Sequence, residues 1–333
     1  MAEAPDLKNQ MNQLIRGYWT TQAIYVAAEL RIADLLANGP RHPEDLAKEA
    51  GVKGHMLYRV LRALASSGIF AETSDGRFEL TPLAETLRSE GGQRAYAMLH
   101  GVELYQSWGR LLDAVRTGDA GFVTAFGMPA FEYFGKFPER GVVFDKAMTG
   151  HHGAEADPML DAFDFSGFEE LVDVGGGNGS LLAAILKRHA GMHGVLFDLP
   201  AVVERASVGD RCRRVGGSFL ESVPAGADAY LLRHVVHDWG DEDAALILRH
   251  CRSAMKPGGK VLVVEIVVPD GNDPSFAKWM DLMMVTYGGK ERSEKQYREL
   301  FRQAGLELTR IVPTRAGISI IEGESQRAPR SGG

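Results

Sequence analysis

The chain has 333 residues, a formal net charge of −7 and 45% hydrophobic residues. This length leaves room for two domains, each with its own apolar core. The acidic balance disfavours a protein that works along nucleic acid. The only two cysteines, Cys212 and Cys251, are too few for a disulfide framework or a structural zinc site.

The sequence also gives expectations about the cellular setting. The first ten residues, MAEAPDLKNQ, are polar and lack the pattern of a secretory signal. The most apolar run, residues 261–268, is short and contains Glu265, which predicts a buried strand rather than a membrane span. We therefore expect a protein of the cytoplasm with no membrane partner.

Residues 8–90 predict a small, mostly helical domain. Apolar residues recur at helical spacing between Met11 and Leu30, and further helices are expected at 32–37, 43–49 and 56–66. Residues 70–80 predict a β-hairpin that turns at Ser74-Asp75-Gly76, and Thr81-Pro82 has the cap and first-position proline of another helix. This order of elements is that of a winged helix-turn-helix.

A winged helix suggests DNA binding, but the charge pattern favours dimerisation. The expected recognition helix carries only Arg59 and Arg62 near its middle, and the wing has no basic cluster. Phosphate contacts dominate the affinity for DNA, so this surface would bind DNA poorly. The long first helix, with Tyr18, Trp19 and Tyr25, suits a surface between the subunits of a homodimer.

Residues 93–165 predict a helical region that is rich in aromatic residues and methionines. Most of these side chains are expected in the core. Because small-molecule pockets are also largely apolar, we expect some of them, Met148 included, to line a pocket for a flat substrate. His151 and His152 could suggest a metal site, but neighbouring residues of a helix do not share a face, and we expect no metal.

From residue 166 to 323 short apolar runs alternate with helical patterns. The expected strands are 171–174, 194–197, 213–216, 229–233, 260–265 and 318–322. This alternation predicts an α/β fold with a doubly wound, mostly parallel sheet. Ligands of such sheets lie at the carboxyl ends of the strands, where this sequence places Gly175, Asp198, Ser218-Phe219, Arg233 and Glu265.

The domain prediction has four segments. Residues 1–92 form the winged-helix-like dimerisation domain, and residues 93–165 form the helical linker and substrate-pocket region. Residues 166–323 form the α/β domain. Residues 324–333 are polar and rich in glycine, serine and proline, which predicts a disordered tail.

The stretch LVDVGGGNGS at residues 171–180 predicts a nucleotide site. Strand residues are followed by Gly175, Gly177 and Gly179 and then by a helical run. Glycines allow a sharp turn and the close approach of a ligand, and a helix N-terminus offers free N–H groups. Ser180 occupies the final glycine position of the dinucleotide motif, and no phosphate loop occurs in the chain.

Asp198 narrows the choice of cofactor. It follows the glycine turn at the spacing of about 20 residues at which an acid accepts hydrogen bonds from ribose hydroxyls. A ribose acid without a full dinucleotide glycine set favours a cofactor that has a ribose but no pyrophosphate. S-adenosylmethionine fits this description. A tight turn that binds nothing is the alternative.

The stretch YLLRHVVHDWGDED at residues 230–243 contains a candidate general base. An apolar strand ends at Arg233, and two histidines follow in a turn. The pKa of histidine lies near neutrality, so His237, close to the cofactor, could remove a proton from a substrate. A purely structural role of His237 remains the alternative, and His234 is expected to be supporting structure.

Residues 276–287, FAKWMDLMMVTY, predict a helix that borders the substrate. Trp279, Met280 and Met283 lie on it, and the flexible methionine side chain suits a pocket wall. The position of this helix just before Glu291 favours contact with a substrate. Ordinary core packing is the alternative.

Taken together, these segments resemble the S-adenosylmethionine-dependent O-methyltransferases of the plant caffeate type and their bacterial small-molecule relatives. The matching segments are LVDVGGGNGS, FDLP at 197–200, VGGSF at 215–219, HDWGDED at 237–243, PGGKVLVVEIVVP at 257–269 and GGKER at 288–292. The resemblance covers nearly the whole chain. It implies a Rossmann-like methyltransferase domain, a dimerisation domain, S-adenosylmethionine as the cofactor and an aromatic natural product as the substrate.

The resemblance also implies roles for single residues. Gly175 would approach the methionine and ribose end of the cofactor, and Asp198 would bind the ribose. The adenine would lie between Ser218 and Phe219, with Arg233 on the purine side.

For the chemistry, the resemblance implies that His237 deprotonates a substrate hydroxyl. Glu265 and Glu291 would hold its imidazole and position the acceptor. Asp238 would order the loop beside the substrate. No metal is implied.

Two positions depart from the family pattern. Ser218 stands where relatives commonly have an aspartate for the adenine amino group; its hydroxyl is shorter and uncharged but can still accept a hydrogen bond. Arg233 stands where many relatives have a lysine, which keeps the charge and changes the geometry. Both departures would affect how the protein binds the cofactor.

Other functions stay open at this stage. A homologous scaffold could catalyse hydroxylation or decarboxylation, and a winged-helix protein could be a DNA-binding regulator that senses S-adenosylmethionine or an aromatic ligand. The combination of His237, Glu265 and Glu291 favours methyl transfer. A hydroxyl acceptor is favoured over an amine, because amines need less help from a base.

Overall fold

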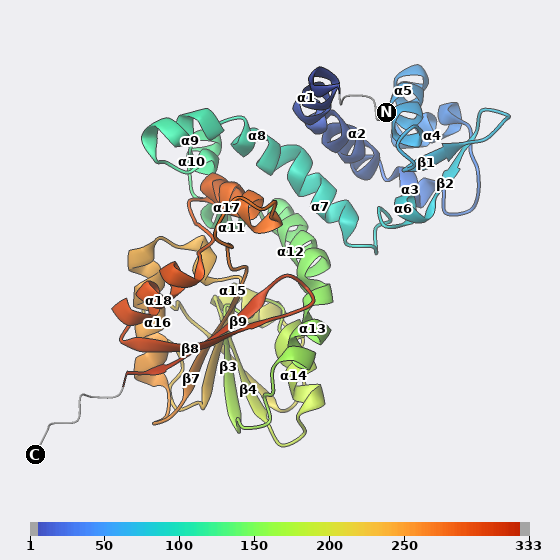
Figure 1. Cartoon of the computed structure of the whole chain (residues 1–333). Helices are drawn as coiled ribbons and strands as arrows, with labels where there is room; N and C mark the ends of the chain where they lie inside the picture. The colour runs from blue at the N-terminus through green and yellow to red at the C-terminus, as the bar shows by residue number, and fades with distance from the viewer. Residues whose placement is uncertain (1–5, 327–333) are drawn as a thin grey trace, which may run out of the picture. The chain divides into compact units, whose positions relative to one another are not determined.

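The structure, a computed structural model, describes residues 6–326. The chain divides into two compact units (Figure 1). Unit 1 consists of Met1–Arg110 and Ala125–His152, and unit 2 consists of Leu111–Thr124 and Gly153–Gly333. The helical region expected at 93–165 is therefore shared between the units, because 111–124 and 153–165 cluster with the α/β domain.

Unit 1 is mostly helical. Its elements are α1 (Leu7–Ile15), α2 (Gly17–Glu29), α3 (Ile32–Leu35), α4 (Pro43–Ala50), α5 (Gly54–Ala65), β1 (Phe70–Glu72), β2 (Phe78–Leu80), α6 (Pro82–Glu85), α7 (Gln93–Leu99), the π-helix η1 (His100–Leu104), α8 (Tyr105–Trp108), α11 (Ala130–Lys136) and α12 (Pro138–His152). The strands β1 and β2 form the expected antiparallel hairpin. Thr81 caps α6 by accepting the N–H of Ala84, as its sequence predicted.

Unit 2 contains the large sheet. Its elements are α9 (Leu111–Thr117), α10 (Gly121–Phe126, which ends in unit 1), η2 (Gly153–Glu155), α13 (Ala156–Ala162), β3 (Glu170–Val174), α14 (Ser180–Arg188), β4 (His193–Asp198), α15 (Pro200–Arg205), β5 (Cys212–Gly216), β6 (Ala229–Arg233), η3 (Val236–Asp238), α16 (Asp241–Ala254), β7 (Lys260–Glu265), α17 (Phe276–Tyr287), α18 (Glu294–Gln303), β8 (Leu306–Pro313) and β9 (Ser319–Ser325). All six expected strands are present, with bounds that differ by up to three residues.

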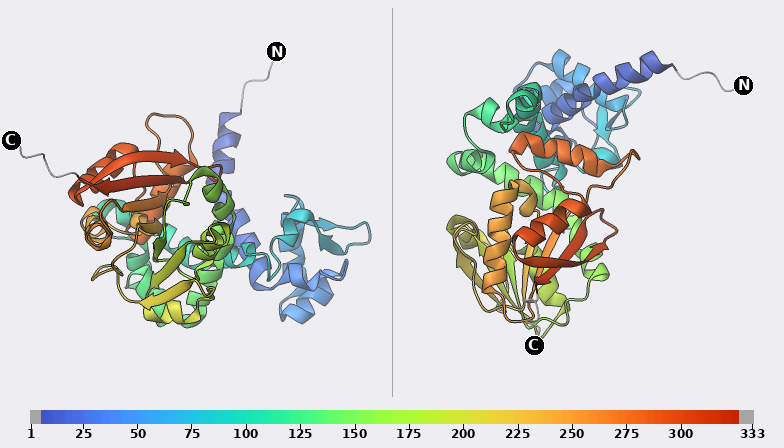
Figure 2. Two further views of the ribbon diagram at one scale, coloured as in Figure 1. Left: turned by 90° about the horizontal axis from the view of Figure 1, so that it is seen from below. Right: turned by 60° about the vertical axis from the view of Figure 1, so that its left-hand side comes forward.

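The sheet has seven strands in the order β5-β4-β3-β6-β7-β9-β8. The first five are parallel, and β9 pairs antiparallel with both β7 and β8 (Figure 2). The expected doubly wound α/β fold is confirmed. The strand β8 was not predicted, although its sequence LELTRIVP partly alternates between apolar and polar residues. The predicted tail begins too early, since Glu324 and Ser325 belong to β9; residues 327–333 lie outside the described part.

Alternate residues of the central strands belong to two separate hydrophobic cores, because successive side chains of a strand point to opposite faces of the sheet. Val172, Tyr230 and Val263 pack on one face with residues of α16 and α18. Leu171, Leu231 and Leu262 pack on the other face with residues of α13, α14 and α15. Figure 1 shows the helices of unit 2 on both sides of the sheet. Continuous apolar runs such as 261–264 are therefore buried on both faces, as is usual for parallel strands.

Within unit 1, Gly101 allows a close contact between α2 and the π-helix. A Cβ added at Gly101 would overlap the ring of Tyr25, and the carbonyl of Gly101 accepts a hydrogen bond from the side chain of Gln22 at 3.2 Å. Single-turn π-helices arise where an α-helix accommodates an irregularity. Here the absent side chain leaves room for the tyrosine ring.

We expect Gly101→Ala to destabilise the protein by about 1–3 kcal/mol, because the added methyl group overfills a packed contact. Thermal unfolding followed by circular dichroism measures the effect. The matched control is Gly135→Ala in α11, where nothing lies within 4 Å of an added Cβ; this change should be neutral or stabilising by up to about 1 kcal/mol. Equal unfolding temperatures for Gly101→Ala and the control would refute the packing argument.

Candidate active site

The glycine turn follows the central strand β3 and precedes α14. Gly175, Gly177 and Gly179 have φ values of 70°, 59° and 78°, in the left-handed region that favours glycine. A Cβ on Gly175 would lie 2.7 Å from Cγ2 of Val235, the second residue after β6. The neighbours β3 and β6 are where the strand order reverses, which is where doubly wound sheets bind ligands.

Asp198 organises this turn from the end of β4. One carboxylate oxygen accepts the N–H of Gly177 at 2.9 Å, and the other accepts the N–H of Leu199 at 2.7 Å. Each carboxylate oxygen has two lone-pair sites, so these two hydrogen bonds do not by themselves exclude a further one from a ligand hydroxyl. The sequence prediction of a ligand acid is compatible with this geometry, and the role of Asp198 in shaping the turn was not foreseen.

Asp173, on β3, is a second acid that sequence reasoning missed. Its side chain is buried, and Oδ2 accepts no hydrogen bond from the described residues. Burial raises its pKa to about 7, although the charge of Arg233 acts in the opposite direction. The only sequence signal was an aspartate inside an apolar strand, directly before the glycine turn.

The residues predicted for the adenine lie near the turn. A Cβ on Gly175 would be 3.6 Å from the ring of Phe219, and this ring meets the indole of Trp239 edge-on at 5.7 Å. The carbonyl of Phe219 is 2.9 Å from Nδ1 of His250, a contact that the sequence did not reveal.

Ser218 and Arg233 already have intramolecular contacts. The hydroxyl of Ser218 accepts the N–H of Leu220 at 3.3 Å. The guanidinium of Arg233 lies 3.7 Å from a carboxylate oxygen of Glu155.

His237 lies on η3, in the turn that follows β6. The backbone of this turn converges on one atom: Oε1 of Glu265 accepts the N–H groups of Val235, Val236 and His237 at 3.1, 3.0 and 3.2 Å. Glu265 is fully buried at the end of β7, the strand beside β6. Three hydrogen bonds to a charged acceptor in a buried position hold the turn firmly.

The imidazole of His237 is held by two carboxylates. Its Nδ1 lies 2.8 Å from Oε1 of Glu291 and 3.1 Å from Oε2 of Glu265, and both glutamates are buried. Ionised carboxylates only accept hydrogen bonds, so we assign the proton to Nδ1. This tautomer leaves Nε2 as the proton acceptor, and Nε2 lies 3.7 Å from the carboxylate of Asp238.

These acids make His237 a strong base. Burial alone would lower the pKa of the imidazole, but the negative charges of Glu265, Asp238 and Glu291 outweigh it and raise this pKa to about 10. Burial raises the pKa values of Glu265 and Asp238 as well, against the attraction of His237. The three predicted catalytic residues are thus brought into one hydrogen-bonded group.

The segment 288–292 packs against the same turn. The N–H of Lys290 donates to the carbonyl of His237 at 2.8 Å. Arg292 is fully buried, and its guanidinium donates to the carbonyls of Val236 and Trp239 at 3.1 and 2.9 Å and to Asp241 at 2.9 Å. Sequence reasoning quoted this arginine in a motif without giving it a role.

The residues predicted to border a substrate lie on separate elements. Trp279, Met280 and Met283 lie on α17 of unit 2, where Trp279 is 66% exposed and the methionines are half-buried. Met148 lies on α12 of unit 1. Their grouping around one substrate therefore stays a prediction.

His234, His237 and Glu265 each have one possible metal-ligand atom within 4.8 Å of the others. Nδ1 of His237 is already engaged by Glu291 and Glu265. We therefore interpret these residues as an acid–base group rather than as metal ligands. Among the described residues, no helix is long and apolar enough to span a membrane.

We expect Arg292→Lys to destabilise the protein by about 2–3 kcal/mol, because one ammonium group cannot replace the planar fork that binds two carbonyls and a carboxylate. Thermal unfolding measures this loss. Lys290→Ala is the matched control, since Lys290 pairs with the same Asp241 in a partly exposed position and such pairs contribute about 0–1 kcal/mol. A stability loss no larger for Arg292→Lys than for the control would contradict this role of Arg292.

Comparison with known proteins identifies the family. Residues 108–307 match the model of the O-methyltransferase domain, and residues 12–90 match that of the O-methyltransferase dimerisation domain. The chain is 45% identical to the phenazine O-methyltransferase of Lysobacter antibioticus, over 96% of this chain and 97% of the relative. It is 38% identical to the caffeic acid 3-O-methyltransferase of Zea mays, over 84% of this chain and 80% of the relative.

A solved structure extends the comparison to the cofactor. The O-methyltransferase NcsB1 of neocarzinostatin biosynthesis, in complex with S-adenosylmethionine and 2-hydroxy-5-methyl naphthoic acid, superposes with a TM-score of 0.82 at 35% identity, covering 92% of this chain and 96% of that one. The expected resemblance to the caffeate type is confirmed. The chain belongs to the plant-type O-methyltransferase family and is an S-adenosylmethionine-dependent O-methyltransferase.

Proposed function

We propose that the enzyme methylates a phenolic hydroxyl of an aromatic natural product, with His237 as the general base and without a metal. The observation that carries the proposal is the imidazole of His237, whose Nδ1 is held by two buried carboxylates at 2.8 and 3.1 Å. This arrangement directs Nε2 toward a substrate as the proton acceptor. The proton-accepting group and the glycine turn both follow strands at the carboxyl edge of one sheet.

The residues around the glycine turn fit S-adenosylmethionine. Asp198 retains lone pairs for the ribose hydroxyls, and Phe219, beside Gly175, offers a ring to the adenine. We propose that Ser218 and Arg233 complete the contacts to the purine. The buried acid Asp173 and the carboxylates around His237 suit a cationic cofactor. When bound, S-adenosylmethionine supplies a methyl group that its sulfonium already activates.

The protein's task is then to orient the acceptor and to remove its proton. A phenol has a pKa of about 10, like tyrosine, and the carboxylates around His237 raise the pKa of its imidazole toward that value. A smaller difference between the two pKa values lowers the cost of moving the proton from oxygen to Nε2. Glu265 and Glu291 then stabilise the imidazolium that forms. Proton transfer of this kind accelerates reactions by about 10²–10⁴-fold.

An aromatic acceptor is supported by the relatives and by α17. Relatives with similarity over most of this chain are named for phenazine and caffeic acid as acceptors, and NcsB1 was solved with a naphthoic acid. In this chain Trp279, Met280 and Met283 offer an apolar surface on α17, and we propose that they contact the ring. We propose that Asp238 borders the hydroxyl, since it lies 3.7 Å from Nε2 of His237; the expectation that Met148, on α12, lines the pocket stays a prediction.

We further propose that the chain forms a homodimer through α1 and the start of α2. Six large apolar side chains are at least half exposed there: Leu7, Met11, Leu14, Ile15, Tyr18 and Trp19. Exposed large apolar side chains that gather on one segment are typical of protein–protein interfaces. The match of residues 12–90 to a dimerisation domain supports a second copy as the occupant.

We expect His237→Gln to lower kcat by about 10²–10⁴-fold, because glutamine cannot accept the proton. The dissociation constant for S-adenosylmethionine, measured by calorimetry, should stay within about two-fold, and turnover should be followed by mass spectrometry with a phenolic acceptor. His193→Gln, which changes an exposed histidine at the start of β4, is the control. Unchanged turnover by His237→Gln would exclude His237 as the base.

We expect Glu291→Gln to shift the pH dependence of kcat/KM. Activity falls at low pH because a protonated imidazole cannot accept the substrate proton. The carboxylate of Glu291 raises the pKa of His237, so its neutralisation lowers that pKa. The acid limb should therefore move to lower pH, while the maximal rate falls because the base is weaker.

A pH–rate profile from about pH 6 to 11 spans the pKa of free histidine, near 6.5, and the raised pKa of His237, about 10. Glu294→Gln is the control, since it removes an exposed carboxylate three residues further along the chain. An acid limb that stays in place or moves to higher pH in Glu291→Gln would contradict the proposed coupling between the two groups.

A further inference from the structure

His234 has a backbone conformation that is uncommon for residues other than glycine. Its φ is 53°, and Arg31 is the only other non-glycine residue with positive φ in the described part of the chain. Residues with a Cβ occupy this left-handed region at a cost, which glycine avoids and asparagine reduces. A histidine at such a position suggests that its side chain contributes something that glycine or asparagine would not.

The left-handed backbone at His234 allows the chain to change direction after β6. The N–H of His234 still pairs with the carbonyl of Val264 at 3.2 Å, as in the sheet. Directly after it, the chain changes direction so that the next three N–H groups point at Oε1 of Glu265. Alternation of left- and right-handed residues is a known way to make successive N–H groups converge on an anion. This backbone requirement does not explain the imidazole.

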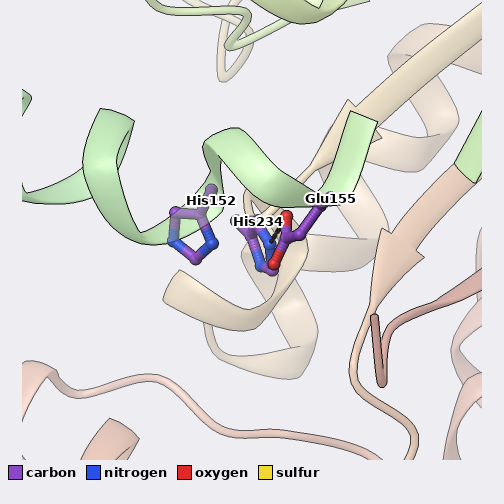
Figure 3. Close-up of side chains that lie close together, drawn as sticks. All are labelled: His152, Glu155 and His234. Atoms are coloured by element: carbon purple, nitrogen blue, oxygen red, sulfur yellow. Dashed lines mark hydrogen bonds and ion pairs between the residues drawn. The ribbon is translucent and has the colours of Figure 1, made fainter. Parts of the chain in front are cut away.

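The imidazole of His234 lies between two acids. Its Nε2 is 2.9 Å from Oε2 of Glu155 (Figure 3), and its Nδ1 is 3.9 Å from Oε2 of Glu265. Glu155 ends η2, and only 9% of it is exposed. Oε2 of Glu265 also faces Nδ1 of His237 at 3.1 Å. Two imidazoles, with ring centres 5.3 Å apart, therefore flank a single carboxylate oxygen.

We propose that His234, anchored by Glu155, is a positioning residue for His237. The hydrogen bond to Glu155 fixes the imidazole of His234 beside Glu265. The ring makes no hydrogen bond with Glu265, but it lies 3.9 Å from Oε2 and limits by packing the movement of the carboxylate that holds both the backbone of the turn and Nδ1 of His237. The proposal rests on the role of His237 as the base, and it adds a second acid–histidine pair, Glu155–His234, to the reaction's supporting residues.

The distances from the ring nitrogens of His234 to Glu155 and Glu265 favour a positioning role for His234 over direct catalysis. The tautomer of His234 that bonds with Glu155 donates Nε2–H to that acid, and its Nδ1 lies 3.9 Å from Glu265 without a hydrogen bond to it. Neither nitrogen is thereby directed at a substrate. A shift of about 1 Å in a catalytic group can cost about 10²-fold in rate, so a contact that fixes the Glu265 carboxylate affects turnover without touching the reactants.

Two substitutions separate the side chain from the backbone. In His234→Gln the amide nitrogen reaches the place of Nε2 and keeps a donor for Glu155, but glutamine does not favour a left-handed backbone. In His234→Asn the backbone is well accommodated, but the shorter amide does not reach Glu155. A role of the side chain predicts that glutamine is the better substitute; a role of the backbone alone predicts that asparagine is.

We expect His234→Gln to keep kcat within about three-fold of the wild type and His234→Asn to lose about ten-fold or more. KM and the dissociation constant for S-adenosylmethionine should change little in both. Glu155→Leu should lower kcat at least as much as His234→Asn, because it also removes the contact between Glu155 and Arg233. The double variant should show no loss beyond that of Glu155→Leu alone, because both changes break the contact between Glu155 and His234. Equal or better turnover of His234→Asn, or additive losses in the double variant, would overturn the proposal.

A second measurement does not depend on turnover. In NMR spectra of full-length protein labelled with ¹⁵N-histidine, the hydrogen-bonded Nδ1–H of His237 should give a downfield proton signal. The signal is assigned to His237 because it should be absent from the spectrum of His237→Gln. We expect this signal to persist in His234→Gln and to shift or broaden in His234→Asn. An unchanged signal in His234→Asn would overturn the proposal.

The two measurements distinguish the possible failures. A wild type that methylates no phenol, with the expected changes in the signal, would contradict the proposed function and leave the positioning role in place. Active His234→Asn with an unaltered signal would contradict the positioning role and leave the proposed function in place. Thermal unfolding of each variant confirms that the comparison is made between folded proteins.

Discussion

The carboxylate of Glu265 connects the fold of this enzyme to its chemistry. One oxygen accepts three consecutive N–H groups of the turn after β6, and the other lies 3.1 Å from Nδ1 of His237. A buried charge is costly unless it is hydrogen-bonded, and these contacts offset that cost. The position depends on the sheet, since β6 and β7 are paired in parallel and end at the same edge. An error in this strand register would misplace the base and its partner together.

The sequence predicted the elements whose residues repeat with a clear period. The strands 229–233 and 260–265 and the helix 276–287 have the predicted bounds, because apolar runs and turn residues mark both ends. The strand β8 was not predicted because its alternation of exposed and buried residues is interrupted at Thr309-Arg310. The disordered tail was predicted to begin too early because Glu324 and Ser325, at the end of β9, are polar. The expectation of an N-terminal dimerisation domain is confirmed by the family match of residues 12–90.

Within the site, the sequence predicted the residues that follow strands or stand in family motifs. His237, Glu265 and Glu291 do lie together, as the resemblance implied. The partners that His234 and Phe219 contact from distant parts of the chain were not predicted. Glu155 and His234 are separated by 79 positions, and His250 and Phe219 by 31. No local pattern marks such pairs, because their partners are chosen by the packing of elements that are distant along the chain.

The acidic character of the site bears on how charge moves during the proposed reaction. Asp173, Glu265 and Glu291 are buried, and burial raises the pKa of Asp173 and Glu265. Such a site favours a cationic ligand over a neutral one. S-adenosylmethionine carries a sulfonium charge, which the cofactor loses when its methyl group is transferred. In the proposed mechanism the proton taken from the acceptor stays on His237, so these carboxylates face one positive charge before the transfer and one after it. The carboxylates that favour the sulfonium therefore also stabilise the imidazolium, and the charge leaves the site only when His237 releases its proton.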